Sequence, residues 1–200
     1  MMRLLLIVSI CYIFTNVNGQ DIDSRAQYPG ALKNSYFNIN PGYIHYPFTP
    51  DHVVPGRTVE EVVIPHGAER MILGHEFSDY FSAQLSVMRP VRWVKFNGWE
   101  GSTEGSGSAW INIWSLSVKP EYPITPKFSV YGEVGISSLS RNGFTFRGQD
   151  MVTSVSYLGL IAGGGLQYAL NDKWDLNLNY NYLPPKKSVQ QPYTMLASAG

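Results

Sequence analysis

Four charged residues stand at positions where a strand would turn its polar side chains to one face: Glu76, Arg92, Glu133 and Asp175. Successive residues of a strand point to opposite faces, so charges of one parity in neighbouring strands can meet. A buried charge is costly unless another group pairs with it. The pattern therefore predicts an interior charge network with a structural role, and no catalytic residue is assigned.

Metal and phosphate chemistry are not predicted. His75 and Glu76 are neighbours in an expected strand and point to opposite faces, so they cannot share one ion. The glycine run at residues 163–165 lies inside an expected strand and opens no helix, so it is not a phosphate loop. Glycines there let bulky side chains approach the backbone. We expect neither a metal nor a cofactor.

Aromatic residues mark the ends of several expected strands, most clearly Trp93, Trp110, Trp174, Tyr180 and Tyr182. They could stack on a ligand, but the aromatic belts found at membrane–water boundaries explain their positions better. On this interpretation Trp174, beside a short turn, lies at one rim of the protein. Trp93 and Trp110 lie near the other rim.

Residues 154–182 contain the clearest strand pattern in the chain. After a turn at residues 171–173, one face carries Trp174, Leu176, Leu178, Tyr180 and Tyr182, and the other carries Asp175, Asn177, Asn179 and Asn181. The residues before the turn alternate as well, so the two runs predict an antiparallel hairpin. An apolar face opposite a face of Asn and Gly fits lipid on one side and a packed polar interior on the other.

Eight strands are expected in all, at residues 34–46, 68–76, 80–96, 109–119, 128–137, 154–170, 174–182 and from 193 onward. Pro41 and Gly42 predict a bulge or an edge-like irregularity, and Pro90 predicts a bulge nearby. Short turns at residues 77–79, 120–126 and 171–173 alternate with long loops at 47–67, 97–108, 140–153 and 183–192. This asymmetry is typical of an all-β, antiparallel up-and-down barrel that spans a membrane, with its long loops outside.

Residues 1–19 have the features of a secretory signal peptide, with a basic start, an apolar run and a cleavable end before Gln20. Residues 20–33 are expected to be a periplasmic lead-in, and 34–200 the barrel. Removing the leader takes away Arg3 and the single cysteine and leaves 14 basic and 15 acidic residues, a formal net charge of −1. No nucleic-acid partner is therefore expected. No later apolar run reaches about 18 residues, so spanning a membrane would require a closed barrel.

The chain resembles the small eight-stranded outer-membrane barrels of Gram-negative bacteria, of the OmpX, OmpW and OmpA-barrel type. The resemblance is carried by the opening strand SYFNINPGYIHY and by the hairpin GLIAGGGLQYALNDKWDLNLNYNY. It implies an outer-membrane protein surrounded by lipid and lipopolysaccharide and inserted by the barrel-assembly machinery. The expected role is structural or surface-binding through the long loops, with an extracellular ligand that the sequence does not name.

The last expected strand departs from the pattern of these barrels. Such barrels normally finish on a strand with a terminal aromatic residue, whereas residues 194–200 read TMLASAG. We expect an incomplete eighth strand and a longer protein of which this chain is a fragment.

The alternative function is a lipid-A-modifying hydrolase similar to the outer-membrane deacylases, which are also eight-stranded barrels. Their motif is His-x-Ser-Asn with an acidic partner, because a serine nucleophile needs a base within hydrogen-bond reach. None of His45, His52, His66 and His75 is followed by serine two residues later. This alternative, with Glu133 and a histidine as acid or base, depends on fold analogy alone. A soluble sandwich is a third possibility, disfavoured because water would cover the apolar face of residues 174–182.

Overall fold

The computed structural model describes residues 34–99, 102–171 and 174–200 of the chain. The expected signal peptide at residues 1–19 and the lead-in at 20–33 lie outside the described residues, and both stay predictions. The strands of the barrel lie within Asn34–Gly200.

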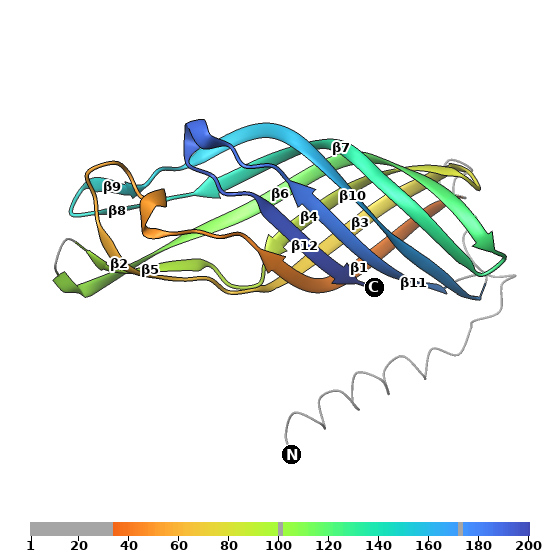
Figure 1. Ribbon diagram of the computed structural model, residues 1–200, viewed down its shortest axis with the longest axis horizontal. Coiled ribbons are helices and arrows are strands. Elements are labelled where there is room, and N and C mark those ends of the chain that lie inside the picture. The colour runs from red at the N-terminus through yellow and green to blue at the C-terminus, as the bar shows by residue number, and fades with distance from the viewer. Residues whose placement is uncertain (1–33, 100–101, 172–173) are drawn as a thin grey trace, which may run out of the picture. The chain divides into compact units, whose positions relative to one another are not determined.

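Eight antiparallel strands form a closed barrel (Figure 1). Around the ring they are β1 (Ser35–His45), β3 (Gly67–Ser78), β4 (Phe81–Pro90), β6 (Ser102–Thr125), β7 (Phe128–Asn142), β10 (Val155–Asn171), β11 (Trp174–Leu183) and β12 (Thr194–Ala199). Because β12 pairs with β11 on one side and with β1 on the other, the ring is closed. The predicted fold class is confirmed.

In β11, side chains that face the lumen alternate with side chains that face outward. Asn177, Asn179 and Asn181 are buried inside the barrel, whereas Trp174 and Leu176 are more than half exposed on the outside. The strand pairs with β10 in the predicted hairpin, with a register shift beside the turn. Side chains of alternate parity therefore divide into a polar lumen set and an apolar outer set, as in barrels that face lipid.

Several strands are longer than expected, because pairing continues through residues that the sequence pattern assigned to turns. β6 runs as far as Thr125, so the turn predicted at residues 120–126 is shorter and lies at residues 126–127, and residues 121–123 pair with β7. At Pro41 there is no bulge, since β1 keeps one register against β3 from Ser35 to Tyr43, but the predicted edge-like irregularity is present, because pairing of β1 with β12 begins only at Gly42. Gly42 matters there for another reason: a Cβ at this position would collide with the backbone of β12.

The long-loop end contains four further strands, where the sequence pattern predicted loops or, at β5, the continuation of a wall strand. β2 (Val59–Val63) and β5 (Val94–Trp99) extend the sheet of β6 beyond the barrel, and β8 (Phe144–Phe146) pairs with β9 (Gln149–Val152) in a separate hairpin. Two short 3-10 turns, η3 (Pro50–His52) and η4 (Lys187–Val189), complete this end. The loops of this end are therefore folded structure.

The last strand, β12, has six residues and pairs with Leu178–Leu183 of β11 and with Gly42–His45 of β1. It is shorter than its neighbour β11, which has ten residues. The seven residues of β1 before Gly42 pair with β3 only. The expectation that a longer protein continues beyond this strand stays a prediction.

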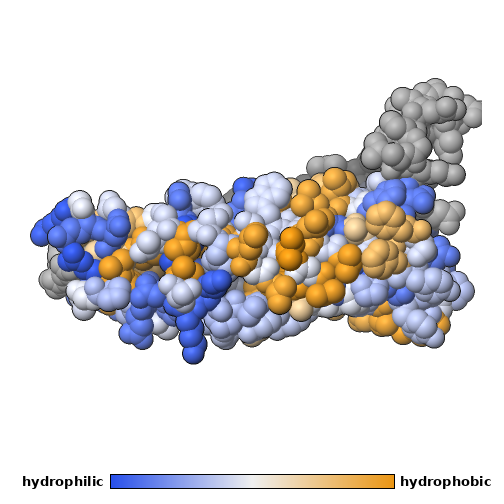
Figure 2. Space-filling model, turned by 90° about the horizontal axis from the view of Figure 1, so that it is seen from above, coloured by the Kyte–Doolittle hydropathy of each residue, from blue (hydrophilic) through white to orange (hydrophobic). Residues whose placement is uncertain are grey.

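Hydrophobic side chains gather on the wall of the barrel (Figure 2). Hydrophilic residues cover the end at the left of this view, which is the end that carries β8 and β9 in Figure 1. Exposed leucines on this wall include Leu158, Leu160 and Leu176, each at least 54% exposed. A stripe of this kind is stable against lipid and unfavourable against water.

Candidate functional site

The centre of the lumen holds a buried ion pair between Arg70 of β3 and Glu133 of β7. The guanidinium donates two hydrogen bonds to the carboxylate, from Nη2 to Oε1 at 2.6 Å and from Nη1 to Oε2 at 3.1 Å. Neither side chain is more than 1% exposed. This two-bond geometry is the strongest that arginine makes with a carboxylate.

Neighbouring polar groups satisfy the rest of the pair. Glu133 also accepts hydrogen bonds from Ser117 and from the amide of Asn181, both at 2.8 Å. Arg70 donates to Asn181 at 2.6 Å and, through Nε and Nη2, to the hydroxyl of Ser86. Ser86 lies 2.7 Å from Ser115. Every charged atom therefore has a partner, which is the condition for a buried pair to be tolerated.

The structure places the four predicted network residues in different surroundings. Glu133 is the carboxylate of the central pair, but its partner, Arg70, was not identified from the sequence. Arg92 is a correction: it is exposed in the segment between β4 and β5, because the chain leaves the barrel wall after Pro90. Glu76 and Asp175 lie near the short-turn end, away from the central pair, and Asp175 accepts a hydrogen bond from Asn177 at 2.8 Å.

A second polar cluster surrounds Lys119, between the central pair and the short-turn end of the barrel. Its ammonium lies 3.0 Å from Glu121 and donates to Gln167 at 2.5 Å. It also lies over the ring of Tyr131, 4.4 Å from the centroid, and Tyr131 donates in turn to Asn179. The lumen near the short-turn end is thus filled by paired side chains, as expected for eight strands.

Between the ion pair and the long-loop end, the lumen becomes apolar. Ile44, Ile113, Leu139 and Leu196 all point inward and are at most 1% exposed. The sequence left the facing of residues 110–114 open, because apolar residues occur there at both parities. The structure resolves it: Ile111 and Ile113 point inward, and Trp110 and Trp114 point outward.

The same apolar core continues out of the barrel into the long-loop end. Phe48 packs against Phe96 of β5 with ring centroids 6.2 Å apart, and Phe96 packs against Phe144 of β8 at 5.7 Å. Met151 of β9 and Val53 of the first loop are buried in this cluster. The loops and hairpins of this end therefore share one hydrophobic core.

A buried arginine, Arg141, links two of these loops through hydrogen bonds. Arg141 is 1% exposed and donates to the carbonyl oxygens of Thr153, Val189 and Gln190 and to the side-chain oxygen of Gln191. These four acceptors lie in the segment before β10 and in the segment before β12. A single guanidinium therefore fixes the relative positions of the two segments through hydrogen bonds to the backbone.

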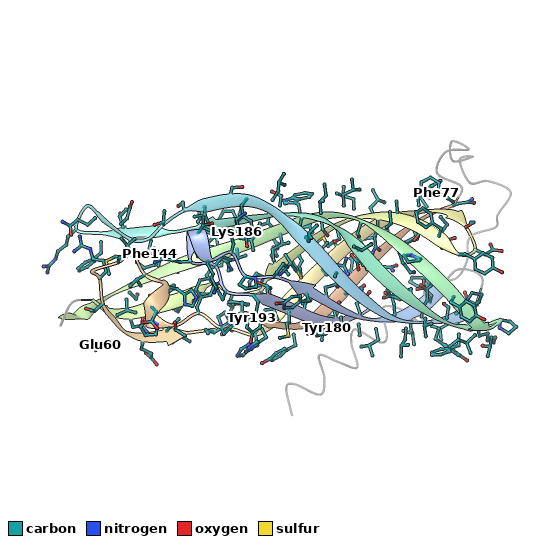
Figure 3. The ribbon with its side chains drawn as sticks, turned by 45° about the horizontal axis from the view of Figure 1, so that its top comes forward. Glu60, Phe77, Phe144, Tyr180, Lys186 and Tyr193 are labelled. Carbon is teal, nitrogen blue, oxygen red and sulfur yellow. The ribbon has the colours of Figure 1, made fainter. Side chains whose placement is uncertain are left out.

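The five predicted interface aromatics all lie on the outer surface. Trp93 and Trp174 are the most exposed, at 57% and 59%. Tyr180 and Tyr182 project from β11, and the ring centroid of Tyr182 lies 6.2 Å from that of Tyr193. Figure 3 labels Tyr180 and Tyr193. That these residues mark the membrane boundaries stays a prediction.

The chain offers no grouped metal ligands over residues 34–99, 102–171 and 174–200: no three His, Cys, Asp or Glu side chains there are placed to hold one ion. In the same residues, no helix has the length and hydrophobicity to cross a membrane.

Known proteins with this architecture come from bacterial outer membranes. Residues 109–193 match the family described as the OmpA-like transmembrane domain. The structure of Ail, the attachment invasion locus protein of Yersinia pestis, in complex with the heparin analogue sucrose octasulfate, is similar at 19% identity, over 83% of this chain and 95% of that chain, with a TM-score of 0.51. Neisserial surface protein A is similar at 13% identity, over 84% and 96%, with a TM-score of 0.51. No curated protein sequence matches the chain.

The closed ring, the lipid-compatible outer wall and the packed polar lumen define the class of protein: it is an eight-stranded transmembrane β-barrel. More particularly, the chain is a small outer-membrane barrel protein, similar over residues 109–193 to the OmpA-like transmembrane domain family. Its location is the bacterial outer membrane.

Proposed function

We propose that this outer-membrane barrel is a surface-binding protein, and that its folded extracellular end is the binding surface. The observation that carries the proposal is the apolar core shared by the extracellular hairpins, in which Phe48, Phe96 and Phe144 pack together. A binding surface gains affinity when its parts are held in place before the ligand arrives, and this core holds the hairpins in place.

The packing of the lumen supports binding over passage. The Arg70–Glu133 pair and the apolar layer of Ile113 and Leu139 fill successive levels of the interior with buried side chains. A solute crossing the barrel would have to displace both levels. Eight strands enclose an interior just wide enough for such side chains.

Exposed cations at the extracellular end suggest the first ligand to test. Four cations at this end are exposed, although Glu60 and other acidic residues lie there too: Lys95 of β5, Arg147 beside β8, Lys186 beside η4 and Lys187 of η4. The similar barrel from Yersinia pestis was solved with a heparin analogue. Heparin is therefore the first probe, and an unsulfated polysaccharide is its control.

The test compares purified protein in lipid nanodiscs on immobilised heparin and on dextran. Replacing Phe96 by Ala removes the centre of the extracellular core, and we expect at least tenfold weaker heparin binding with the barrel still heat-modifiable on gels. Val63→Ala, on the exposed face of the neighbouring strand β2, is the matched control and should bind as wild type. Stepwise ion conductance by the purified barrel, or unchanged binding by the Phe96 variant, would contradict the proposal.

The alternative, a lipid-A hydrolase, has less geometric support. Glu133, the acid that it requires, is bonded to Arg70, Ser117 and Asn181, and none of these partners is a histidine. Release of fatty acid from lipid A by the purified barrel would nevertheless favour it over surface binding. We further propose that lipopolysaccharide surrounds the barrel and that the barrel-assembly machinery inserts it.

A further inference from the structure

A histidine closes a turn of the first long loop with its own side chain. The Nδ1 atom of His52 accepts a hydrogen bond from the backbone N–H of Thr49 at 3.0 Å and lies 2.9 Å from the hydroxyl of Thr49. The backbone N–H of His52 donates in return to the carbonyl of Thr49 at 3.0 Å. The imidazole therefore caps the 3-10 turn η3, in the position that Glu or Gln takes in a capping box.

This capping bond requires a neutral imidazole. Nδ1 accepts a hydrogen bond only while it carries no proton, because a protonated imidazole donates at both nitrogens. The hydroxyl of Thr49 can rotate to accept a proton from Nδ1, but the backbone N–H of Thr49 cannot turn away. Protonation of His52 therefore sets two donors against each other and breaks the bond that closes η3.

Two charged groups act on His52 within the described residues, and they act in opposite directions. Arg141 of β7 disfavours a second cation, whereas Asp51, the preceding residue, favours one. Burial, the largest cause, and Arg141 together lower the pKa of His52, and Asp51 and the backbone of Thr49 oppose them only in part. Arg141 cannot swing away, because it is 1% exposed and bonded to carbonyl oxygens of two loops. The closed turn therefore favours the neutral imidazole.

The turn holds the first loop on the hydrophobic core of the long-loop end. The ring of His52 meets the ring of Phe48 edge-on, with centroids 5.4 Å apart, and Phe48 belongs to that core. Val53 follows the turn and is 4% exposed. The backbone N–H of Val54 then donates to the carbonyl of Met151 in β9 at 2.8 Å. A change at His52 is therefore passed to the contact between the first loop and the β8–β9 hairpin.

The same turn borders a cavity of about 350 Å³. The lining includes residues on both sides of the imidazole and one residue of another loop: Pro50, Asp51, Val53 and Gln190. Gln190 is fixed from the other side, because its carbonyl accepts a hydrogen bond from Arg141 at 3.0 Å. The shape of the cavity therefore depends on whether η3 stays closed.

We propose that the long-loop end is a pH-dependent binding surface: neutral His52 holds the first loop closed, and protonation of His52 releases it. The inference rests on the proposed surface-binding function and names the regulation of that same surface. An unperturbed imidazole titrates near pH 6.5, so the loop is closed above about pH 6.5 and opens progressively below it. Opening removes the preorganisation of the surface and weakens binding. Added positive charge alone would strengthen the binding of an anion such as heparin, so the two effects have opposite signs.

The test measures heparin binding by the protein in lipid nanodiscs at about pH 7.5 and about pH 5. His52→Gln supplies an acceptor that does not titrate in this range, and Gln is a usual residue at this position of a capping box. At about pH 5 we expect the wild type to bind at least about threefold more weakly than His52→Gln, and the two to bind alike at about pH 7.5. His75→Gln, near the short-turn end of β3, is the matched control and should keep the pH dependence of the wild type.

A second measurement needs no ligand. In the wild type, protection of the Thr49 and Val54 amides from hydrogen exchange should fall about tenfold between these pH values, whereas in His52→Gln it should stay constant. Constant protection in the wild type, or equally weak binding by the wild type and His52→Gln at about pH 5, would overturn the proposal. Absence of heparin binding at both pH values, with protection that falls only in the wild type, would reject the proposed ligand and support the switch.

Discussion

Replacing Arg70 by Met would leave the carboxylate of Glu133 buried without its countercharge. Arg70 makes five hydrogen bonds in the lumen, two of them to Glu133. Removing one partner of a buried ion pair typically costs about 3–5 kcal/mol, because the remaining charge stays desolvated. Glu133 would keep its bonds from Ser117 and Asn181, so we expect a loss near the lower end, about 3 kcal/mol.

The assay is urea unfolding of the barrel in phospholipid vesicles, followed by the gel shift between folded and unfolded forms. Glu69→Gln is the matched control: it breaks the exposed pair with Arg89, for which about 0–1 kcal/mol is expected. The double variant Arg70→Met with Glu133→Leu should recover most of the stability, because no unpaired charge remains. Equal losses for Arg70→Met and Glu69→Gln, or a double variant as unstable as Arg70→Met, would refute the reasoning.

Three further predictions concern the wall and the extracellular end. Gly165→Ala should prevent folding, seen as loss of the heat-modifiable band, because a Cβ there would collide with the backbone of β11, whereas Gly159→Ala has room and should fold. Arg141→Lys should increase protease cleavage of the extracellular loops at least tenfold while the barrel stays folded, because lysine cannot reach four acceptors at once. Burial, together with the charge of Arg141, lowers the pKa of His52. The unfolded loop then binds protons more readily than the folded loop. Protease resistance should therefore be complete above about pH 6.5 and should fall as the pH drops below that value. His52→Gln should remove this pH dependence.

The barrel itself could be predicted from the sequence because the alternation of apolar and polar side chains is a property of each strand by itself. In a strand that faces lipid on one side and a polar lumen on the other, hydrophobicity must alternate with a period of two. Residues 174–182 show this alternation, and the structure gives β11 the predicted facing and the predicted partner, β10. The alternation of short turns and long loops likewise predicted which strand ends lie at each end of the barrel.

The charge network shows what alternation cannot determine. Glu133 could be assigned to the lumen by parity, but its partner comes from β3, 63 residues earlier in the chain. Ile72 follows Arg70 at the same parity, so this strand has no uniformly polar face that would reveal its inward side. Which of several charges lies opposite Glu133 depends on the stagger of strands around the closed ring.

The long-loop end was the largest gap in the sequence prediction. Residues 97–108 and 140–153 have the composition of loops, yet much of both segments forms strands, because Phe96, Phe144 and Met151 meet in one core. These residues are scattered singly in the sequence, and nothing in their spacing indicates contact. The bulge at residues 89–93 is similar: Pro90 signals an irregularity, but only pairing with both neighbouring strands decides its size and direction. The sequence by itself therefore determined the wall and its two faces, since each strand carries that pattern alone. The tertiary structure decided the lumen pairs, the folded long-loop end and the bulge at residues 89–93, because each of these depends on contacts between distant segments.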